Sequence, residues 1–172
     1  MSRRVAVVGL AAGLALVPLS GAAASSGGRS RSVQVDGTGV SDASAPIGLS
    51  CDSTSRCLVS TLIPGSISGD VMGVTTARGA SYANLRTGDY FGNSVLTIAG
   101  AVDGCGEGSF TVSLADFSGN LALSAPATGV VVPGSGTGSL EGVSGRASFV
   151  FTPAAAGAGT YTYRMKLRCR AG

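Results

Sequence analysis

The C-terminal segment "TYTYRMKLRCR", residues 160–170, alternates between apolar and polar side chains from end to end. The apolar set is Tyr161, Tyr163, Met165, Leu167 and Cys169. The polar set between them is Thr162, Arg164, Lys166, Arg168 and Arg170. A repeat of two residues is that of a β-strand and excludes an amphipathic helix, whose repeat is about 3.6 residues. The segment is therefore predicted to be a strand with one face in a hydrophobic core.

The same alternation recurs upstream, and it predicts an all-β protein. In "SFTVSLADF" the residues Phe110, Val112 and Leu114 fall on one face, and the Gly-Asn pair in 118–120 predicts a tight hairpin turn. Further short strands are predicted in "SVQVDGTGV", "CLVSTLI", "SISGDVMGVTT" and "SVLTIAGAV". About eight strands joined as consecutive hairpins favour an eight-stranded antiparallel up-and-down barrel, which leaves no sheet edge exposed.

The N-terminus has the three-part pattern of a secretory signal peptide. Met1 to Ala24 begins with two arginines, continues with an apolar run from Val5 to Leu19 and ends in small residues. This run is shorter than the roughly 20 residues of a membrane-spanning helix. We expect cleavage after Ala24, a secreted protein in the extracellular or cell-envelope space, and no stable membrane insertion.

The domain organisation follows from this cleavage. Residues 1–24 are the predicted signal peptide, the polar, Gly-rich residues 25–32 a flexible leader, and residues 33–172 a single β-barrel domain.

The charge balance of the processed chain is nearly neutral. Of the 12 basic residues two lie in the signal peptide, which leaves 10 against 9 acidic residues and a net charge of +1. In the last strand the cations fall on the face opposite the tyrosines, whereas single-stranded nucleic acid is bound by cations and rings together. We therefore expect no nucleic-acid partner.

Four cysteines in an exported chain predict two disulfides. Three pairings are possible, and we favour Cys51 with Cys57, because the polar stretch "CDSTSRC" can close a small loop, and Cys105 with Cys169. A zinc site is the rival use of four cysteines. The sequence has no CxxC pair and no histidine, so no metal is expected.

The glycine-rich segment "VVVPGSGTGSLEGVSGRASFVF", residues 130–151, raises the question of a phosphate-binding loop. It lacks the lysine of a P-loop, and Ser139 stands where the dinucleotide motif needs its third glycine, so no cofactor is expected. We expect Gly134, Gly136 and Gly138 to lie in a strand whose inner face lacks side chains, followed by a turn in "EGVSG".

Two segments carry a family resemblance. "VVVPGSGTGSLEGVSG" and the later "TYTYRMKL" are similar to a bacterial family of unknown function with an allene oxide cyclase-like barrel. The resemblance implies an eight-stranded barrel with a lipocalin-like interior. It does not imply the cyclase reaction, because the shared residues are those of turns and strands rather than of a catalytic site.

A catalytic site has few candidates. The absence of histidine excludes every mechanism built on imidazole. Counting by twos from Phe110 leaves Asp116 as a carboxylate pointing inward, where an apolar barrel would raise its pKa and allow proton transfer. The alternative, which we favour, is that Asp116 only caps the adjacent turn. The enzyme assignment is therefore open and leans towards no enzyme.

The bulky residues of the last two strands are either plain core or the lining of a ligand cavity. They are Phe149, Phe151, Tyr161, Tyr163 and Met165. Three functions follow: a barrel that binds a small apolar molecule, which we rank first; a cyclase or isomerase acting on a lipophilic substrate; and a structural protein whose barrel is filled. The sequence leaves the oligomeric state open.

Overall fold

The computed structural model describes residues 29–42, 45–120, 125–154 and 158–170, with the side chains of 45–46, 115–120 and 125 left out of the description. The predicted signal peptide and the first half of the predicted leader, residues 1–28, lie outside this range. The first strand starts at Ser30, three residues before the expected leader boundary.

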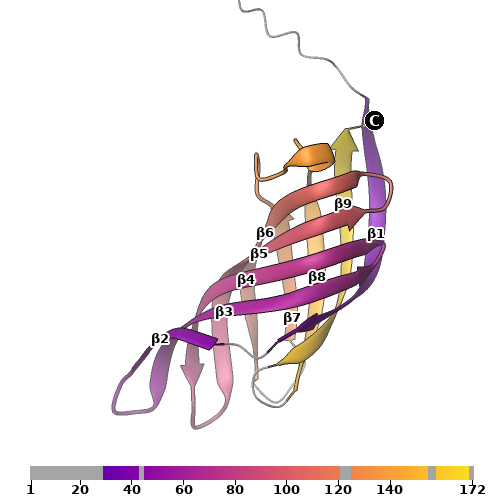
Figure 1. The fold of residues 1–172 in the computed structure, drawn as a ribbon. Helices are drawn as coiled ribbons and strands as arrows, with labels where there is room; N and C mark the ends of the chain where they lie inside the picture. The colour runs from indigo at the N-terminus through magenta and orange to yellow at the C-terminus, as the bar shows by residue number, and fades with distance from the viewer. Residues whose placement is uncertain (1–28, 43–44, 121–124, 155–157, 171–172) are drawn as a thin grey trace, which may run out of the picture.

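Within the described residues, nine strands form one antiparallel sheet (Figure 1). They are β1 (Ser30–Ser41), β2 (Ala45–Cys51), β3 (Arg56–Gly69), β4 (Val71–Asn84), β5 (Asp89–Val102), β6 (Gly106–Asn120), β7 (Ala125–Val131), β8 (Ser144–Pro153) and β9 (Gly159–Arg170). The strand order is β1-β9-β8-β7-β6-β5-β4-β3-β2, and β1 also pairs with β3. This extra pairing closes eight strands of the described part into a barrel, which confirms the predicted fold class. β1 and β2 lie one after the other along the same edge of β3, because β1 pairs with the end of β3 and β2 pairs with its beginning.

The alternation read in residues 160–170 sets the inside and the outside of the barrel. The odd-numbered residues of β9 from Tyr161 to Cys169 are at most 8% exposed, and the even-numbered ones are exposed. Phe110, Val112 and Leu114 of β6 face the same core. Burial of each such side chain contributes about 1.5–3 kcal/mol, so this interior is the main source of stability.

Two tyrosines of β9 cover the seam where β1 meets β3. Tyr163 and Tyr161 lie opposite Gly37 and Gly39 of β1, and their rings occupy the space that side chains at these glycines would need. The Tyr161 hydroxyl donates to the Ser66 carbonyl of β3 at 2.9 Å. The glycines of β1 therefore let the rings reach across one strand and bond to the next.

The glycine-rich segment closes one end of the barrel and is not a strand, so the prediction of a bare inner wall at Gly134, Gly136 and Gly138 is wrong. Residues 132–143 form a loop with a short 3-10 helix, η1 (Gly138–Leu140). Leu140 and Val143 are 1% and 2% exposed and belong to the core, so the loop acts as a plug.

Hydroxyl groups hold this plug to β6. Ser135 Oγ accepts from the Thr111 N–H at 3.0 Å, and Thr137 Oγ1 accepts from the Ser109 N–H at 3.0 Å. These side chains satisfy backbone donors of β6 that a neighbouring strand would otherwise satisfy. The predicted turn in "EGVSG" lies just after η1, where Gly142 has a φ of 77°.

The hairpin turn predicted at 118–120 is also wrong, because β6 continues to Asn120. β6 stays paired with β5 over its whole length, and Asp89 pairs with Asn120. The register shifts on the way: Ser94 pairs with Leu114, but Gly92 pairs with Phe117. Such a bulge interrupts the regular pairing between Leu114 and Phe117.

Both expected disulfides are present, one near each end of the barrel. Cys105–Cys169 ties the β5–β6 turn to the end of β9, near the plug. Cys51–Cys57 joins directly paired residues of β2 and β3 at the opposite end. The sequence-based pairing is therefore confirmed.

Candidate functional site

The end of the barrel opposite the plug carries a hollow built by two protruding hairpins. The β2–β3 and β4–β5 hairpins extend beyond the rest of the barrel at the lower left of Figure 1. The hollow has a volume of about 910 Å³, within the range of roughly 300–1,000 Å³ that is usual for small-molecule sites. Its lining residues are Ser50, Cys51, Asp52, Arg56, Leu58, Tyr82, Ala83, Asn84, Asp89, Tyr90 and Phe91.

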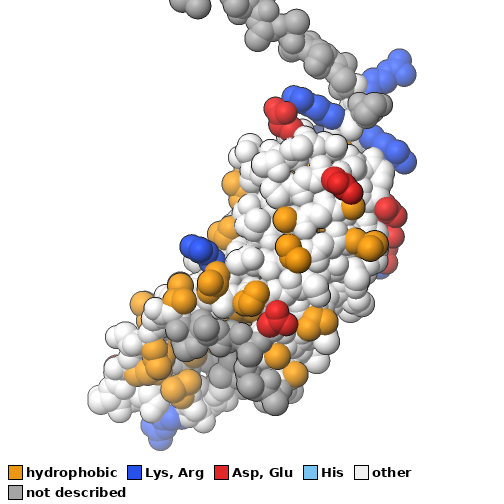
Figure 2. All heavy atoms as spheres, in the orientation of Figure 1, with side chains coloured by type: hydrophobic (Ala, Val, Ile, Leu, Met, Phe, Trp, Pro, Cys, Tyr) orange, Lys and Arg blue, Asp and Glu red, His pale blue; other side chains and the backbone are white. Residues whose placement is uncertain are grey.

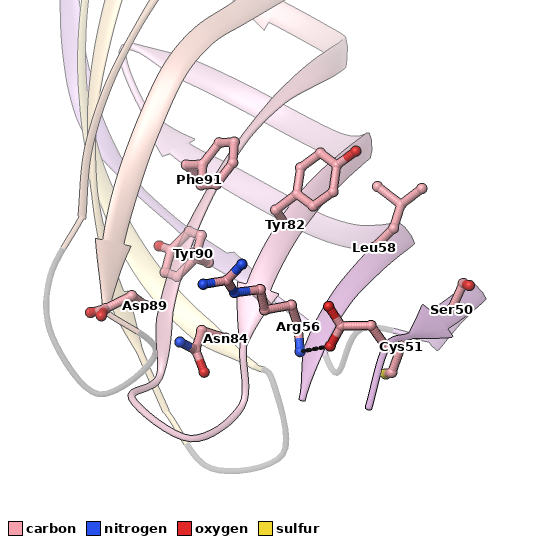
Figure 3. Close-up of a pocket in the computed structure, with 11 residues that line it drawn as sticks. Ser50, Cys51, Arg56, Leu58, Tyr82, Asn84, Asp89, Tyr90 and Phe91 are labelled. Atoms are coloured by element: carbon pink, nitrogen blue, oxygen red, sulfur yellow. Dashed lines mark hydrogen bonds between the residues drawn. The ribbon is translucent and has the colours of Figure 1, made fainter. Parts of the chain in front are cut away.

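A row of three large apolar side chains forms one side of the hollow (Figure 3). Leu58 pairs with Tyr82, and Tyr82 pairs with Phe91, so the row crosses three adjacent strands. Their exposed fractions are 41%, 53% and 60%. The two rings are stacked, with centroids 5.3 Å apart and an interplanar angle of 19°. We call these three residues the aromatic row.

The register explains why the aromatic row is exposed. In β3 the odd-numbered Cys57 and Ile67 point into the barrel, which places the even-numbered Leu58 on the outer face. Tyr82 of β4 is on the same outer face, since its neighbour Ala83 is buried. Hydrophobic side chains also gather at this end of the molecule in the space-filling view (Figure 2). A contiguous exposed apolar group is a candidate for an interaction site.

Polar side chains line the hollow next to the aromatic row. Arg56 pairs with Asn84 two positions beyond the Leu58–Tyr82 pair, and Asp89 begins the next strand (Figure 3). Arg56 is exposed. The hollow therefore combines an apolar surface with a guanidinium group that can bind an anionic or hydrogen-bonding head group.

Asp52 shapes the β2–β3 turn that carries Arg56. Its Oδ1 accepts from the Thr54 N–H at 2.8 Å, the Thr54 hydroxyl at 2.7 Å and the Arg56 N–H at 3.0 Å. The Thr54 side chain and these backbone N–H groups lower the pKa of the Asp52 carboxyl. The carboxylate is thus a structural acceptor that fixes the start of β3, and Ser55 takes a φ of 65° to complete the turn.

Tyr90 lies on the other face of the same strands. It pairs with Ala83, which pairs with Cys57. Partial burial raises the pKa of the Tyr90 hydroxyl. The Tyr90 side chain thus lines the hollow from the face opposite the aromatic row.

The five residues expected to line a ligand cavity lie at the core instead of in this hollow. Phe149, Tyr161, Tyr163 and Met165 are at most 8% exposed, and Phe151 packs against them. Phe149 makes ring contacts with both tyrosines, at centroid distances of 6.0 and 6.5 Å. Ligand binding by these five residues stays a prediction.

The tyrosine hydroxyls are already engaged with the backbone. Tyr163 Oη accepts from the Val71 N–H at 2.9 Å and lies 3.2 Å from the Ser68 carbonyl, to which it donates. Within the described part of the chain, no buried side-chain nitrogen or oxygen lacks a hydrogen-bond partner. The packed interior thus offers a ligand no unused tyrosine anchor.

The remaining sequence candidates stand as follows. Asp116 lies in β6, but its side chain falls outside the described residues. Cys51 lines the hollow and is bonded to Cys57, so it is not a free nucleophile. Among the described residues, no helix is long and apolar enough to cross a membrane.

Sequence reasoning missed the aromatic row. Its members come from three segments, and their proximity depends on the register of β3, β4 and β5. A weak signal exists in "CLVSTLI", where both faces are apolar although only one can face the core.

The fold and the hollow together define a small antiparallel barrel of eight strands among the described residues, plugged at one end and hollowed between two hairpins at the other. The family model of DUF3224, described as a protein of unknown function, matches residues 53–165. The chain belongs to this family. No curated protein matches it.

A solved structure shares the fold. It is the crystal structure of a protein of unknown function from the DUF3224 family of Shewanella oneidensis MR-1. The two are 17% identical with a TM-score of 0.60, and the similarity covers 83% of this chain and 100% of the other.

Proposed function

We propose that the protein is an exported, disulfide-stabilised barrel that binds a small, largely apolar molecule in the hollow beside the aromatic row. The observation that carries the proposal is the stacked pair Tyr82 and Phe91. Both side chains are more than half exposed, and both line the hollow of about 910 Å³. Covering these rings removes apolar surface from water, at about 25 cal/mol per Å².

Arg56 refines the class of ligand. The Arg56 guanidinium lies next to apolar side chains and shares the hollow with the carboxylates of Asp52 and Asp89. Because Asp52 is engaged within its own turn, the guanidinium suits a molecule with a hydrophobic body and one anionic group, such as a carboxylate. Export is supported by the two disulfides, which are typical of oxidising compartments, and by the signal peptide pattern. The motif in residues 130–145 and the eight-strand closure support a barrel of the allene oxide cyclase-like type.

A structural role is the second candidate, and the packed interior favours it. The core residues that face inward from β9 are almost fully buried, and both inward tyrosines are bonded to the backbone. In that case the aromatic row would take up no small molecule.

The test uses 1-anilinonaphthalene-8-sulfonate, which has an apolar ring system and one sulfonate. The protein contains no tryptophan, so no energy transfer from tryptophan contributes to the fluorescence of the probe. We expect saturable binding to the wild type. The double variant Tyr82→Ser/Phe91→Ser loses two half-exposed aromatic groups and should bind about tenfold more weakly or worse, since 1.4 kcal/mol corresponds to a factor of ten.

Met72→Ser is the matched control. Met72 is 65% exposed on β4, as exposed as Phe91, but does not line the hollow. Its variant should bind the probe like the wild type. Equal binding by wild type, control and double variant would contradict the proposed site and favour the structural role.

A further inference from the structure

A second surface of the barrel, away from the hollow, is strongly basic. Within the described residues, the outer face of β8 and β9 carries five exposed cations. We call this set the basic face: Arg146, Arg164, Lys166, Arg168 and Arg170.

The strand geometry places these cations in a regular array. Alternate residues of β9 are about 6.8 Å apart along the strand, twice the rise per residue. Lys166 lies directly opposite Arg146 on β8. Like charges in this position destabilise a sheet, so the pairing is unfavourable until an anion lies between them.

Neutral residues surround the middle of the basic face. Lys166 faces Gln34 on its other side, and Arg168 lies between Ser32 and Ser144. Among the described residues, the acidic neighbours of these cations lie only towards the two ends of the basic face. Asp36 lies opposite Arg164, and Glu141 is 4.0 Å from Arg170.

The ion pair at the end does little to neutralise the array. The side chains of Arg170 and Glu141 are 60% and 70% exposed, and such pairs contribute between about 0 and 1 kcal/mol. The positive potential over Arg146, Lys166 and Arg168 therefore remains open to an external anion.

We propose that the basic face binds a linear acidic polysaccharide. A straight row of cations along one strand complements a chain that carries charges at repeated positions. The hydroxyl and amide groups of Ser32, Ser144 and Gln34, which flank the row, can bond to sugar hydroxyls. Single-stranded nucleic acid fits less well, because the tyrosines of β9 point into the core and cannot stack on bases.

The experiment measures binding to immobilised heparin, a linear polysaccharide with sulfate and carboxylate groups, as a function of salt. Two double variants with the same loss of charge are compared. Lys166→Gln/Arg168→Gln alters the middle of the basic face. Arg78→Gln/Arg86→Gln removes two exposed cations from β4 and the β4–β5 turn.

We expect the first variant to bind heparin about tenfold more weakly than the wild type and the second to change binding less than about twofold. Equal losses would show a response to net charge alone and would overturn the proposal. Tighter binding of wild type to a single-stranded oligonucleotide than to heparin would also overturn it. Lys166 and Arg168 do not line the hollow, so the loss expected for the first variant is independent of the proposed ligand site.

Discussion

Replacing Tyr163 by Phe should cost stability out of proportion to the single oxygen removed. Its hydroxyl accepts from the Val71 N–H at 2.9 Å and donates to the Ser68 carbonyl at 3.2 Å. Val71 is 0% exposed, so water cannot readily replace the lost acceptor. Leaving a buried donor unpaired costs about 1–3 kcal/mol, and we expect Tyr163→Phe to lower the free energy of unfolding by about 2 kcal/mol.

Tyr161→Phe is the matched comparison. Its hydroxyl donates to the Ser66 carbonyl at 2.9 Å and is hydrogen-bonded with the Thr75 side chain, whose hydroxyl can rotate to another acceptor. It accepts no backbone N–H among the described contacts. A carbonyl that loses one donor is less costly than an orphaned N–H, so the expected loss is about 0.5–1 kcal/mol. Urea unfolding followed by circular dichroism gives both values, provided that the slope m is unchanged.

The pH dependence adds a second readout. Burial raises the pKa of the Tyr163 hydroxyl above 10.0. The folded state therefore holds this proton more tightly than the unfolded state, so the stabilisation is complete below about pH 10 and is lost as the pH rises through the folded pKa. Tyr163→Phe should therefore lose less stability than wild type as the pH rises above about 10, the reference pKa of tyrosine. Equal losses for the two Phe variants at pH 7 would refute the role assigned to Tyr163.

Four further predictions each concern one feature of the molecule. Gly39→Ala places a methyl group inside the ring of Tyr161 and should cost about 1–3 kcal/mol in urea unfolding; a neutral result would contradict the packing of the seam. Removing the Cys105–Cys169 disulfide with two serines opens a link across 64 residues and should cost about 4 kcal/mol by thermal unfolding, whereas no change would count against the link. Because the Asp52 pKa is lowered from 3.8, the stability that its carboxylate adds is present above pH 3.8 and lost as the pH falls below it; Asp52→Asn should therefore show a weaker acid dependence, and an identical acid profile would contradict this. N-terminal sequencing of exported material should begin at Ser25, and a start at Met1 would contradict the signal peptide.

Much of the barrel could be predicted from local patterns. β9 was clear because its alternation is unbroken over 160–170. The disulfides followed from loop length and polarity. The strands depend on residues close in sequence, and four cysteines allow only three pairings.

The errors have a common physical cause. Gly134, Gly136 and Gly138 imitate a strand because they recur at every second position, but hydroxyl groups of Ser135 and Thr137 take over the pairing with β6 and leave a loop. The device expected there, glycines that clear the inner face of a strand, occurs at Gly37 and Gly39 of β1. The local pattern is the same in both places, and only the partner across the strand distinguishes them.

The aromatic row could not be predicted for a different reason. Leu58, Tyr82 and Phe91 each belong to a separate strand, and nothing local to any of them fixes the register of the others. Once β3, β4 and β5 are aligned, the three side chains share one face of the protruding hairpins. The site is therefore a product of tertiary pairing.

The most direct test of the central claim is native mass spectrometry of the wild type and of Tyr82→Ser/Phe91→Ser after exposure to a lipid extract. The account predicts a reproducible added mass of a few hundred daltons on the wild type and its loss from the double variant, with the same charge-state distribution for both proteins. An added mass retained by the double variant would place the ligand elsewhere. A wild type that remains free of ligand would contradict the claim that the hollow binds a small apolar molecule.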